Sequence, residues 1–150
     1  MPDHFALVPA AYLYLLREGE RGTEVLLQLR QGTGYMDGFW AAAAAGHVER
    51  DETVQEAVLR EALEELGLAG VDLVFELTMQ RIGRGDPIDE RVDFFFSARS
   101  WSGEPRLQEP DKAAGLRWFP LTALPDATVP YEREALTLFG GDTRFLAIRL

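Results

Sequence analysis

Three glutamates lie in the segment GHVERDETVQEAVLREALEELGL, residues 46–68, where Glu64 and Glu65 follow Glu61 by three and four residues. In a helix, which turns by ~100° per residue, side chains at this spacing lie above one another on one face. Like charges in that arrangement destabilise an isolated helix by roughly 0.2–0.5 kcal/mol per pair, so we expect a positive partner. Arg60 can pair with Glu64 one turn on, but one guanidinium cannot satisfy all three carboxylates. A divalent cation can.

The type of cation follows from the ligand atoms. The cluster offers only carboxylate oxygens, which suit Mg²⁺ or Mn²⁺ and argue against zinc. The chain contains no cysteine, so neither a thiolate metal site nor a disulfide framework is available. Acidic helix faces are more often solvated surface, and the three glutamates alone do not separate that interpretation from a metal site. The flanking residues separate the two interpretations.

Those flanking residues form a known pattern. Gly46, Glu52 and the run from Arg60 to Leu68 resemble the Nudix box, G-x5-E-x7-R-E-U-x-E-E-x-G-U with U aliphatic. Every fixed position matches, with the small Ala62 at an aliphatic position. Seven glycine or charged positions held over 23 residues argue against a chance match. The resemblance implies one Nudix domain over residues 1–150, with its box at 46–68.

The resemblance also implies a reaction, the hydrolysis of a diphosphate linkage with two or three Mg²⁺ ions, for which Mn²⁺ could substitute. Glu61 and Glu65 are the expected metal ligands, and the backbone carbonyl of Ala45 matches a backbone ligand of the family. Glu64 is either a third ligand or the general base, and Arg60 orients the glutamates. Members of the family differ in their base, and Glu109 in a loop outside the box is the alternative.

Outside the box, the stretches TGYMDG, DERVDFFF, EPDK and LRWFPLTALP resemble the MutT-like branch, which acts on nucleoside triphosphates and their oxidised or modified forms. The implied products are a nucleoside monophosphate and pyrophosphate. Two alternatives stay open, namely hydrolysis of ADP-ribose or another nucleoside diphosphate derivative, and a non-catalytic Nudix-fold module that only binds nucleotides. The expected substrate contacts combine bases for phosphate with aromatic rings for a nucleobase: Arg30, Lys112, Tyr35, Trp40, Phe94 and Phe96.

Composition limits the partners. The 150 residues are 47% hydrophobic and 27% charged, which is enough material for one full core, and the formal net charge is −10. So acidic a chain is a poor partner for a nucleic-acid polymer, because that binding depends on Lys and Arg meeting phosphates. No apolar run approaches the ~20 residues of a membrane span, and the first ten residues lack a basic leader, so we expect a cytoplasmic protein. Whether it is a monomer or a homodimer is open.

Strands and two helices must position these side chains. Apolar alternation predicts strands over residues 5–16, 23–30, 70–83, 90–100, 116–121 and 145–150, the first two forming a hairpin. Helices are predicted over 53–66 and 131–139, and the first should bury one apolar arc: Val54, Val58, Leu59, Ala62, Leu63 and Leu66. This pattern fits an α/β or α+β domain, and the resemblance implies an α/β/α sandwich with a mixed sheet and a loop-helix-loop motif.

One segment departs from the family pattern. Before the box glycine, Nudix proteins usually carry a Pro-Gly-Gly turn, whereas this chain has Ala44, Ala45 and Gly46 after a run of alanines. We therefore expect a bulge or an altered turn in residues 41–45. The expected metal contact of the Ala45 carbonyl depends on that geometry.

Overall fold

The computed structural model describes residues 3–150. Its elements in chain order are β1 (Val8–Gly19), β2 (Gly22–Arg30), β3 (Trp40–Ala42), β4 (Ala44–His47), α1 (Val54–Leu66), β5 (Val74–Ile82), the 3₁₀ turn η1 (Pro87–Asp89), β6 (Arg91–Ala98), β7 (Ala113–Pro120), the 3₁₀ turn η2 (Leu121–Ala123), α2 (Pro130–Leu136) and β8 (Phe145–Arg149). The expected strands and both expected helices are present, with ends that shift by a few residues.

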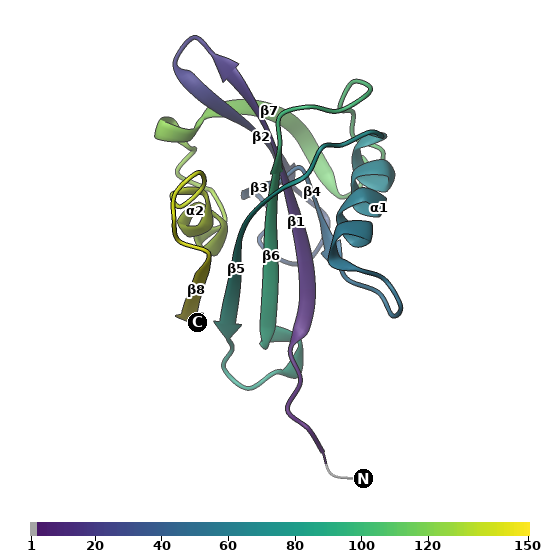
Figure 1. Cartoon of the computed structure of the whole chain (residues 1–150), viewed down its shortest axis with the longest axis vertical. Helices are drawn as coiled ribbons and strands as arrows, with labels where there is room; N and C mark the ends of the chain where they lie inside the picture. The colour runs from purple at the N-terminus through teal and green to yellow at the C-terminus, as the bar shows by residue number, and fades with distance from the viewer. Residues whose placement is uncertain (1–2) are drawn as a thin grey trace.

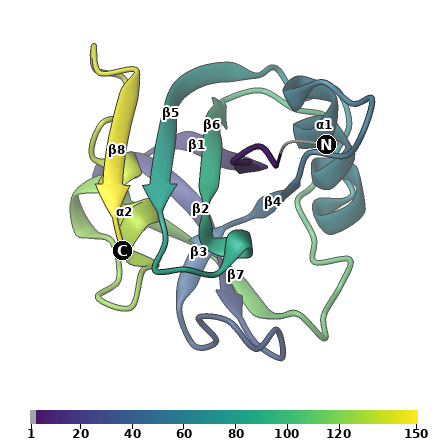
Figure 2. The same ribbon diagram turned by 90° about the horizontal axis from the view of Figure 1, so that it is seen from below.

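The strands form one mixed sheet in the order β3-β2-β1-β6-β5-β8, to which β4 adds by pairing with β1 and β7 by pairing with β2. The pairs β1–β6 and β5–β8 are parallel, and the remaining pairs are antiparallel. Helices α1 and α2 lie on opposite sides of the sheet (Figure 1), and the view from below shows β8, β5, β6 and β1 in succession (Figure 2). The predicted sandwich with a mixed sheet is confirmed.

Strand β1 separates two cores. Because successive side chains of a strand point to opposite faces, Tyr12, Tyr14 and Leu16 pack on the side of α2, whereas Leu13 and Leu15 pack on the side of α1. All five are buried. Covering both faces accounts for the almost continuous apolar sequence of this strand.

Helix α1 begins and ends at strong local signals. Thr53 is its N-cap and forms a capping box with Glu56, whose backbone N–H donates to the Thr53 hydroxyl while its carboxylate accepts the Thr53 N–H. Gly67 ends the helix in the left-handed conformation, with φ 68°. The bounds predicted from the sequence differ from these by one residue.

The buried face of α1 corrects the predicted arc. The buried residues are Ala57, Val58, Ala62 and Leu66. Leu59 and Leu63, which we expected in the core, are 42% and 59% exposed. Ala57 and Ala62 are fully buried, and their small side chains let the helix lie close to the sheet, so only a narrow stripe is covered. The leucines beside that stripe remain at the surface.

The alanine run is where the chain changes partner strands. β3 pairs with β2 as far as Ala42, and β4 pairs with β1 from Ala44 onward. Ala41 and Ala42 belong to the core beneath α2, whereas Ala43 and Ala44 belong to the core beneath α1. The exchange of partner strands falls within residues 41–45, where we expected a bulge or an altered turn, and the small side chains let the backbone pass between the cores.

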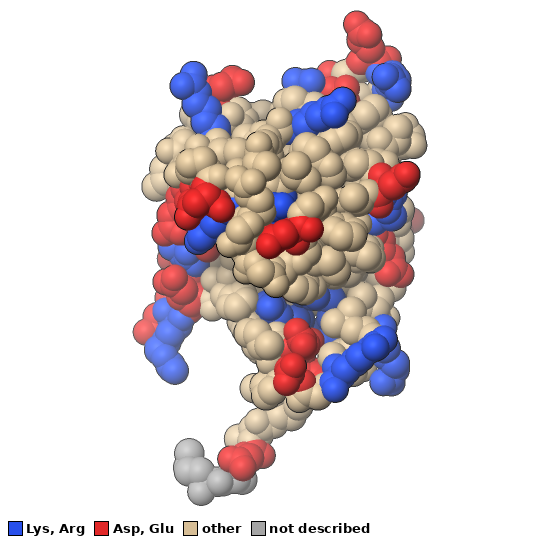
Figure 3. All heavy atoms as spheres, turned by 180° about the vertical axis from the view of Figure 1, so that it is seen from behind, with Lys and Arg blue, Asp and Glu red and all other residues tan. Residues whose placement is uncertain are grey.

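The surface carries both signs of charge. Figure 3 shows acidic and basic side chains interspersed over the face behind the view of Figure 1, rather than gathered into one basic area. Neither described α-helix is long and apolar enough to cross a membrane.

Candidate active site

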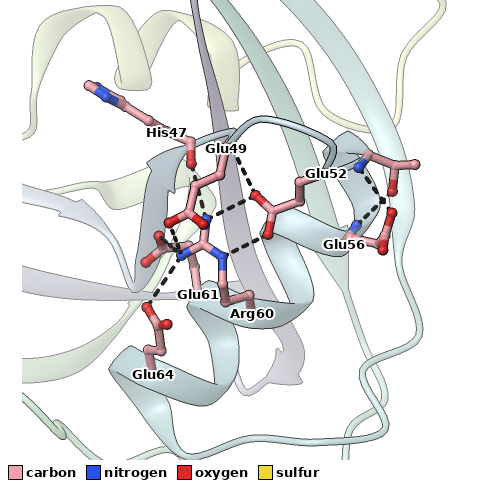
Figure 4. A network of polar contacts seen from close by, with 8 residues as sticks. His47, Glu49, Glu52, Glu56, Arg60, Glu61 and Glu64 are labelled. Carbon is pink, nitrogen blue, oxygen red and sulfur yellow. Dashed lines mark hydrogen bonds and ion pairs between the residues drawn. The ribbon is translucent and has the colours of Figure 1, made fainter.

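Arg60 lies at the centre of the acidic face of α1 (Figure 4). Its Nε and Nη2 bind the two oxygens of Glu52 at 2.7 and 3.0 Å, and its Nη1 lies 2.7 Å from Glu61 Oε1 and 3.3 Å from Glu64 Oε2. Nη2 also donates to the carbonyl of His47 at 3.1 Å. The hydrogen bond from Arg60 holds the pKa of Glu52 at about 2. Arg60 therefore joins the helix to the turn before it and fixes three carboxylates.

The box glycine makes room for Glu61. A Cβ on Gly46 would overlap the carboxyl group of Glu61, so only glycine lets that carboxylate lie against β4. Burial raises the pKa of Glu61, the hydrogen bond and charge of Arg60 oppose this rise, and the charges of Glu64 and Glu109 add to it. Glu61 is thus a partly desolvated carboxylate whose neighbours include further acids.

Glu65 is the acid that Arg60 does not reach. Its Oε2 accepts the backbone N–H of Ala45 at 2.7 Å. Burial raises the pKa of Glu65 to about 8, and the charges of Glu61 and Glu109 contribute in the same direction. These carboxylates crowd negative charge at one place with hard oxygen atoms, which fits a divalent cation such as Mg²⁺. In residues 3–150, no three His, Cys, Asp or Glu side chains already face a common metal position.

A loop brings the alternative base to the same place. Its backbone is tied to the end of α1, because the N–H of Gln108 donates to the carbonyl of Glu65 at 3.0 Å. Glu109 follows directly, and its Oε2 lies 2.8 Å from Lys112 Nζ. Glu64 is on the outer side, with 52% of its side chain exposed. Both expected bases, Glu64 and Glu109, therefore lie beside the cluster.

Two adjoining pockets meet at Glu65. One has a volume of about 190 Å³ and the other of about 420 Å³, and Gln28, Arg30 and Glu65 line both. The larger also contains Glu109 and Lys112. Together they form a cleft with Glu65, one member of the acidic cluster, in its wall.

Arg30, at the end of β2, and Tyr35, in the loop of residues 31–39 that follows, both line this cleft. Arg30 donates from Nε to the Tyr35 carbonyl at 2.9 Å and from Nη2 to Thr33 Oγ1 at 3.1 Å, and its guanidinium lies 5.7 Å from the centre of the Tyr35 ring. Tyr35 is 48% exposed and lines the smaller pocket. Among the six expected substrate contacts, the structure brings Arg30, Tyr35 and Lys112 to the cleft.

The other three, Trp40, Phe94 and Phe96, line neither pocket. Trp40 packs edge-on against Phe119, with ring centres 4.8 Å apart. Phe94 and Phe96 point to the α1 side of β6, where Phe96 is 4% exposed and packs on Phe75. The structure places these three rings, which we expected to stack on a nucleobase, against the two cores rather than in the cleft, because strand alternation turns them inward.

The smaller pocket contains residues that the sequence interpretation missed. Tyr12, Tyr131 and Glu132 line it, and Glu132 is 3% exposed. The helical period contained the signal, because Ala135 and Leu136 lie three and four residues after Glu132 and are buried on the same face. An acid on an apolar helix face is unusual enough to mark a site.

His47 also lines this pocket, beside the box glycine. Its Nε2 lies 2.8 Å from Nη1 of Arg91, and burial followed by the charge of Arg91 lowers the pKa of His47. A neutral imidazole that accepts from Arg91 fits this geometry. The pair places a cation at the pocket near the acidic cluster.

Comparisons with known proteins agree with this arrangement. A family model described as the NUDIX domain matches residues 6–139. An isopentenyl-diphosphate Delta-isomerase of Jannaschia sp. is 31% identical over 119 residues, which cover 77% of this chain and 65% of that protein. The uncharacterized Nudix hydrolase YfcD of Shigella flexneri is 32% identical over 131 residues, covering 77% and 64%. The chain therefore spans just under two thirds of the length of these curated relatives.

Solved structures give the same picture. A MutT NUDIX hydrolase from Burkholderia pseudomallei superposes with a TM-score of 0.77 and 30% identity, covering 89% of this chain and 98% of that one. A MutT/nudix family protein from Enterococcus faecalis superposes with a TM-score of 0.63 and 27% identity, covering 79% of this chain and 46% of that one.

Proposed function

Because this chain belongs to the NUDIX family, we propose that it is a MutT-like Nudix hydrolase that cleaves the diphosphate linkage of a nucleoside triphosphate or of a modified, for example oxidised, nucleotide. The reaction depends on Mg²⁺ and releases a nucleoside monophosphate and pyrophosphate in the cytoplasm. The observation that carries the proposal is the position of Glu65, which lies in the wall of a cleft between the acidic cluster and a pocket with tyrosine walls.

Glu61 and Glu65 are the residues that would hold Mg²⁺, with Glu64 and the carbonyl of Ala45 as further ligands and Mn²⁺ as a substitute. When bound, the ion neutralises the phosphate chain and lowers the pKa of a water molecule. The general base that accepts the proton of the attacking water would be Glu109, or Glu64 where it is not a metal ligand. Arg60 contributes indirectly, because its contacts with Glu61 and Glu64 hold both carboxylates in place.

The rest of the cleft supports an anionic substrate with a polar ring. Arg30 and Lys112 supply positive charge for phosphate oxygens on the side of the larger pocket. Tyr12, Tyr35 and Tyr131 supply flat surfaces in the smaller pocket, where a nucleobase can stack. The net charge of −10 does not oppose this, since the substrate meets a local cluster of cations rather than the whole surface.

The relatives suggest a second candidate, an enzyme acting on isopentenyl diphosphate. That substrate shares the diphosphate group but ends in a hydrocarbon chain. The smaller pocket suits it poorly, because Glu132, Gln28, Arg30 and Arg91 would each lose solvation without gaining a partner. ADP-ribose and other nucleoside diphosphate derivatives remain chemically closer alternatives.

A substrate panel tests the proposal. The purified chain is incubated with Mg²⁺ and with nucleoside triphosphates, 8-oxo-purine triphosphates, ADP-ribose or isopentenyl diphosphate, and the products are separated by chromatography. We expect a nucleoside monophosphate and pyrophosphate in equal amounts from a triphosphate, and none when EDTA replaces Mg²⁺. Turnover of isopentenyl diphosphate alone would refute the nucleotide assignment, and turnover of ADP-ribose alone would move it to the diphosphate derivatives.

A further inference from the structure

The backbone of one residue in β3, Ala42, holds two side chains of the smaller pocket. The backbone N–H of Ala42 donates to Glu132 Oε1 at 2.7 Å, and the backbone carbonyl of Ala42 accepts from Gln28 Nε2 at 3.0 Å. Because a carbonyl can only accept, the atom of Gln28 at that position must be the amide nitrogen. The other atom of the amide, Oε1, is an acceptor that this contact leaves free.

Glu132 is fixed in a similar way. Its Oε1 accepts a second hydrogen bond, from the hydroxyl of Tyr14 at 2.5 Å, so two donors occupy the same oxygen. The other oxygen, Oε2, has no partner among residues 3–150. Every fully buried side-chain nitrogen or oxygen of these residues has a hydrogen-bond partner. Because Oε2 has none, it is not fully buried, and it faces the open space of the pocket that Glu132 lines. A side chain that is 3% exposed thus presents one acceptor to that space.

The walls of this pocket are held in place from behind. The guanidinium of Arg81 lies 3.7 Å from the centre of the Tyr131 ring and is itself bound to the buried Asp93 at 2.6 Å. The ring of Tyr12 stacks on Phe95 with centres 4.7 Å apart. Such supported rings lose little conformational entropy when a flat ligand binds. The pocket therefore combines rigid aromatic walls with two acceptors anchored on the backbone of one residue, Ala42.

Resting on the proposed function, we infer that Glu132 and Gln28 determine base specificity by accepting hydrogen bonds from a ring edge with two adjacent N–H donors, as in guanine. Adenine presents an unprotonated ring nitrogen at the corresponding position, and that nitrogen would face an acceptor. Hypoxanthine keeps the ring N–H but lacks the exocyclic amine, so it satisfies only one of the two acceptors. A ligand that leaves a buried acceptor without a donor binds more weakly by roughly a factor of ten or more.

Binding of nucleoside monophosphates to the metal-free chain tests this inference without catalysis. Isothermal titration calorimetry at pH 8 compares GMP, IMP and AMP. At this pH the carboxyl of Glu132 is mostly ionised, because burial raises its pKa only to about 7. We expect GMP to bind about tenfold more tightly than IMP, and AMP to bind most weakly. Equal affinities, or tighter binding of AMP, would overturn the inference.

Two variants separate base recognition from a merely structural role. In Glu132→Gln the amide oxygen accepts the hydrogen bonds of Tyr14 and Ala42, so the NH₂ group faces the pocket. This donor fits the unprotonated ring nitrogen of adenine, so the preference should reverse towards AMP. Gln28→Met removes one acceptor and should weaken GMP about tenfold without weakening AMP. Glu134→Gln, an exposed position on the same helix, is the matched control and should leave all three affinities unchanged. An equal loss for every ligand in Glu132→Gln would contradict base recognition.

The outcome does not depend on those variants folding, because the wild-type ligand series alone tests the order of affinities. It also separates two failures. If the chain hydrolyses nucleoside triphosphates without discriminating between bases, only the base assignment falls. If it neither binds nor hydrolyses any nucleotide but cleaves another diphosphate, the proposed substrate class falls as well.

Discussion

Glu65 Oε2 accepts the backbone N–H of Ala45 at 2.7 Å, and this contact fastens helix α1 to strand β4. It brings a partly buried carboxylate next to Ala45, the residue whose carbonyl is the expected backbone metal ligand. One glutamate oxygen is thereby committed to the fold, while the charge of the group stays uncompensated by Arg60.

Gly46→Ala should reduce turnover by about 10- to 100-fold and leave the fold intact, since the added methyl group displaces only the carboxyl of Glu61. The measurement is the initial rate as a function of Mg²⁺ concentration, with circular dichroism to verify folding. Gly115→Ala is the control, because a Cβ there meets no atom within 4 Å. A Gly46→Ala variant with a wild-type rate would show that the position of Glu61 is unimportant.

Arg60→Lys should lower activity by roughly 10- to 100-fold, although the charge is kept. An ammonium group cannot contact both oxygens of Glu52 while also binding Glu61, so the glutamates lose their orientation. Mg²⁺ titrations of the initial rate should show a higher concentration for half-maximal activity. Arg99→Lys, in an exposed pair with Glu18, serves as the comparison and should behave like wild type.

Glu132→Gln should stabilise the protein at high pH. Burial raises the pKa of Glu132 from 4.5 to about 7, against the hydrogen bonds from Tyr14 and Ala42. The folded protein therefore holds a proton that the unfolded chain has lost between these pH values, so wild-type stability falls as the pH rises through this window. Urea unfolding should show the variant gaining about 3 kcal/mol over wild type between pH 4 and pH 8.

That gain is the signature of a carboxylate ionised at a desolvated site. Asp93 and Arg30 also act on Glu132 electrostatically, and Glu134→Gln controls for any general effect of charge. A difference between variant and wild type that stayed constant across this pH range would show that Glu132 titrates normally.

The exposed leucines of α1 should tolerate truncation. Leu63→Ala is expected to change the free energy of unfolding by less than about 0.5 kcal/mol, because the side chain is 59% exposed. Leu66→Ala on the buried stripe should cost roughly 2–5 kcal/mol. Urea denaturation of both variants gives the comparison, and similar losses would mean that Leu63 is covered by another surface in solution.

Much of the fold could be predicted from local patterns. The capping residues Thr53 and Gly67 mark the ends of α1 because their chemistry acts within a few residues. Alternation marks strands such as β6 for the same reason. How closely a helix packs on a sheet depends on the side chains of the sheet as well as on its own. The exposure of Leu59 and Leu63 therefore could not be inferred from the sequence of the helix alone.

The site also has one part that is local in sequence and one part that is not. The spacing of the fixed residues from Gly46 to Gly67 is local in sequence. The resemblance to the Nudix box rests on this spacing, so the acidic cluster could be predicted. The pocket joins the first strands of the chain to α2, and Ala42 and Glu132 are 90 residues apart, so Glu132 and Tyr12 had no shared signal. Phe94 and Phe96 were assigned to the substrate by residue type, although Phe95, between them in sequence, faces the α2 side of the sheet.

The most direct test of the central claim is the rate of pyrophosphate release from a nucleoside triphosphate by wild type and Glu65→Gln, each with Mg²⁺ and with EDTA. We predict turnover only for wild type with Mg²⁺, a loss of orders of magnitude in the variant, and a higher melting temperature for the metal-free variant because a carboxylate with a pKa of about 8 has been neutralised. Glu20→Gln, exposed in the first hairpin, should match wild type. Wild-type turnover by Glu65→Gln in Mg²⁺ would contradict the account.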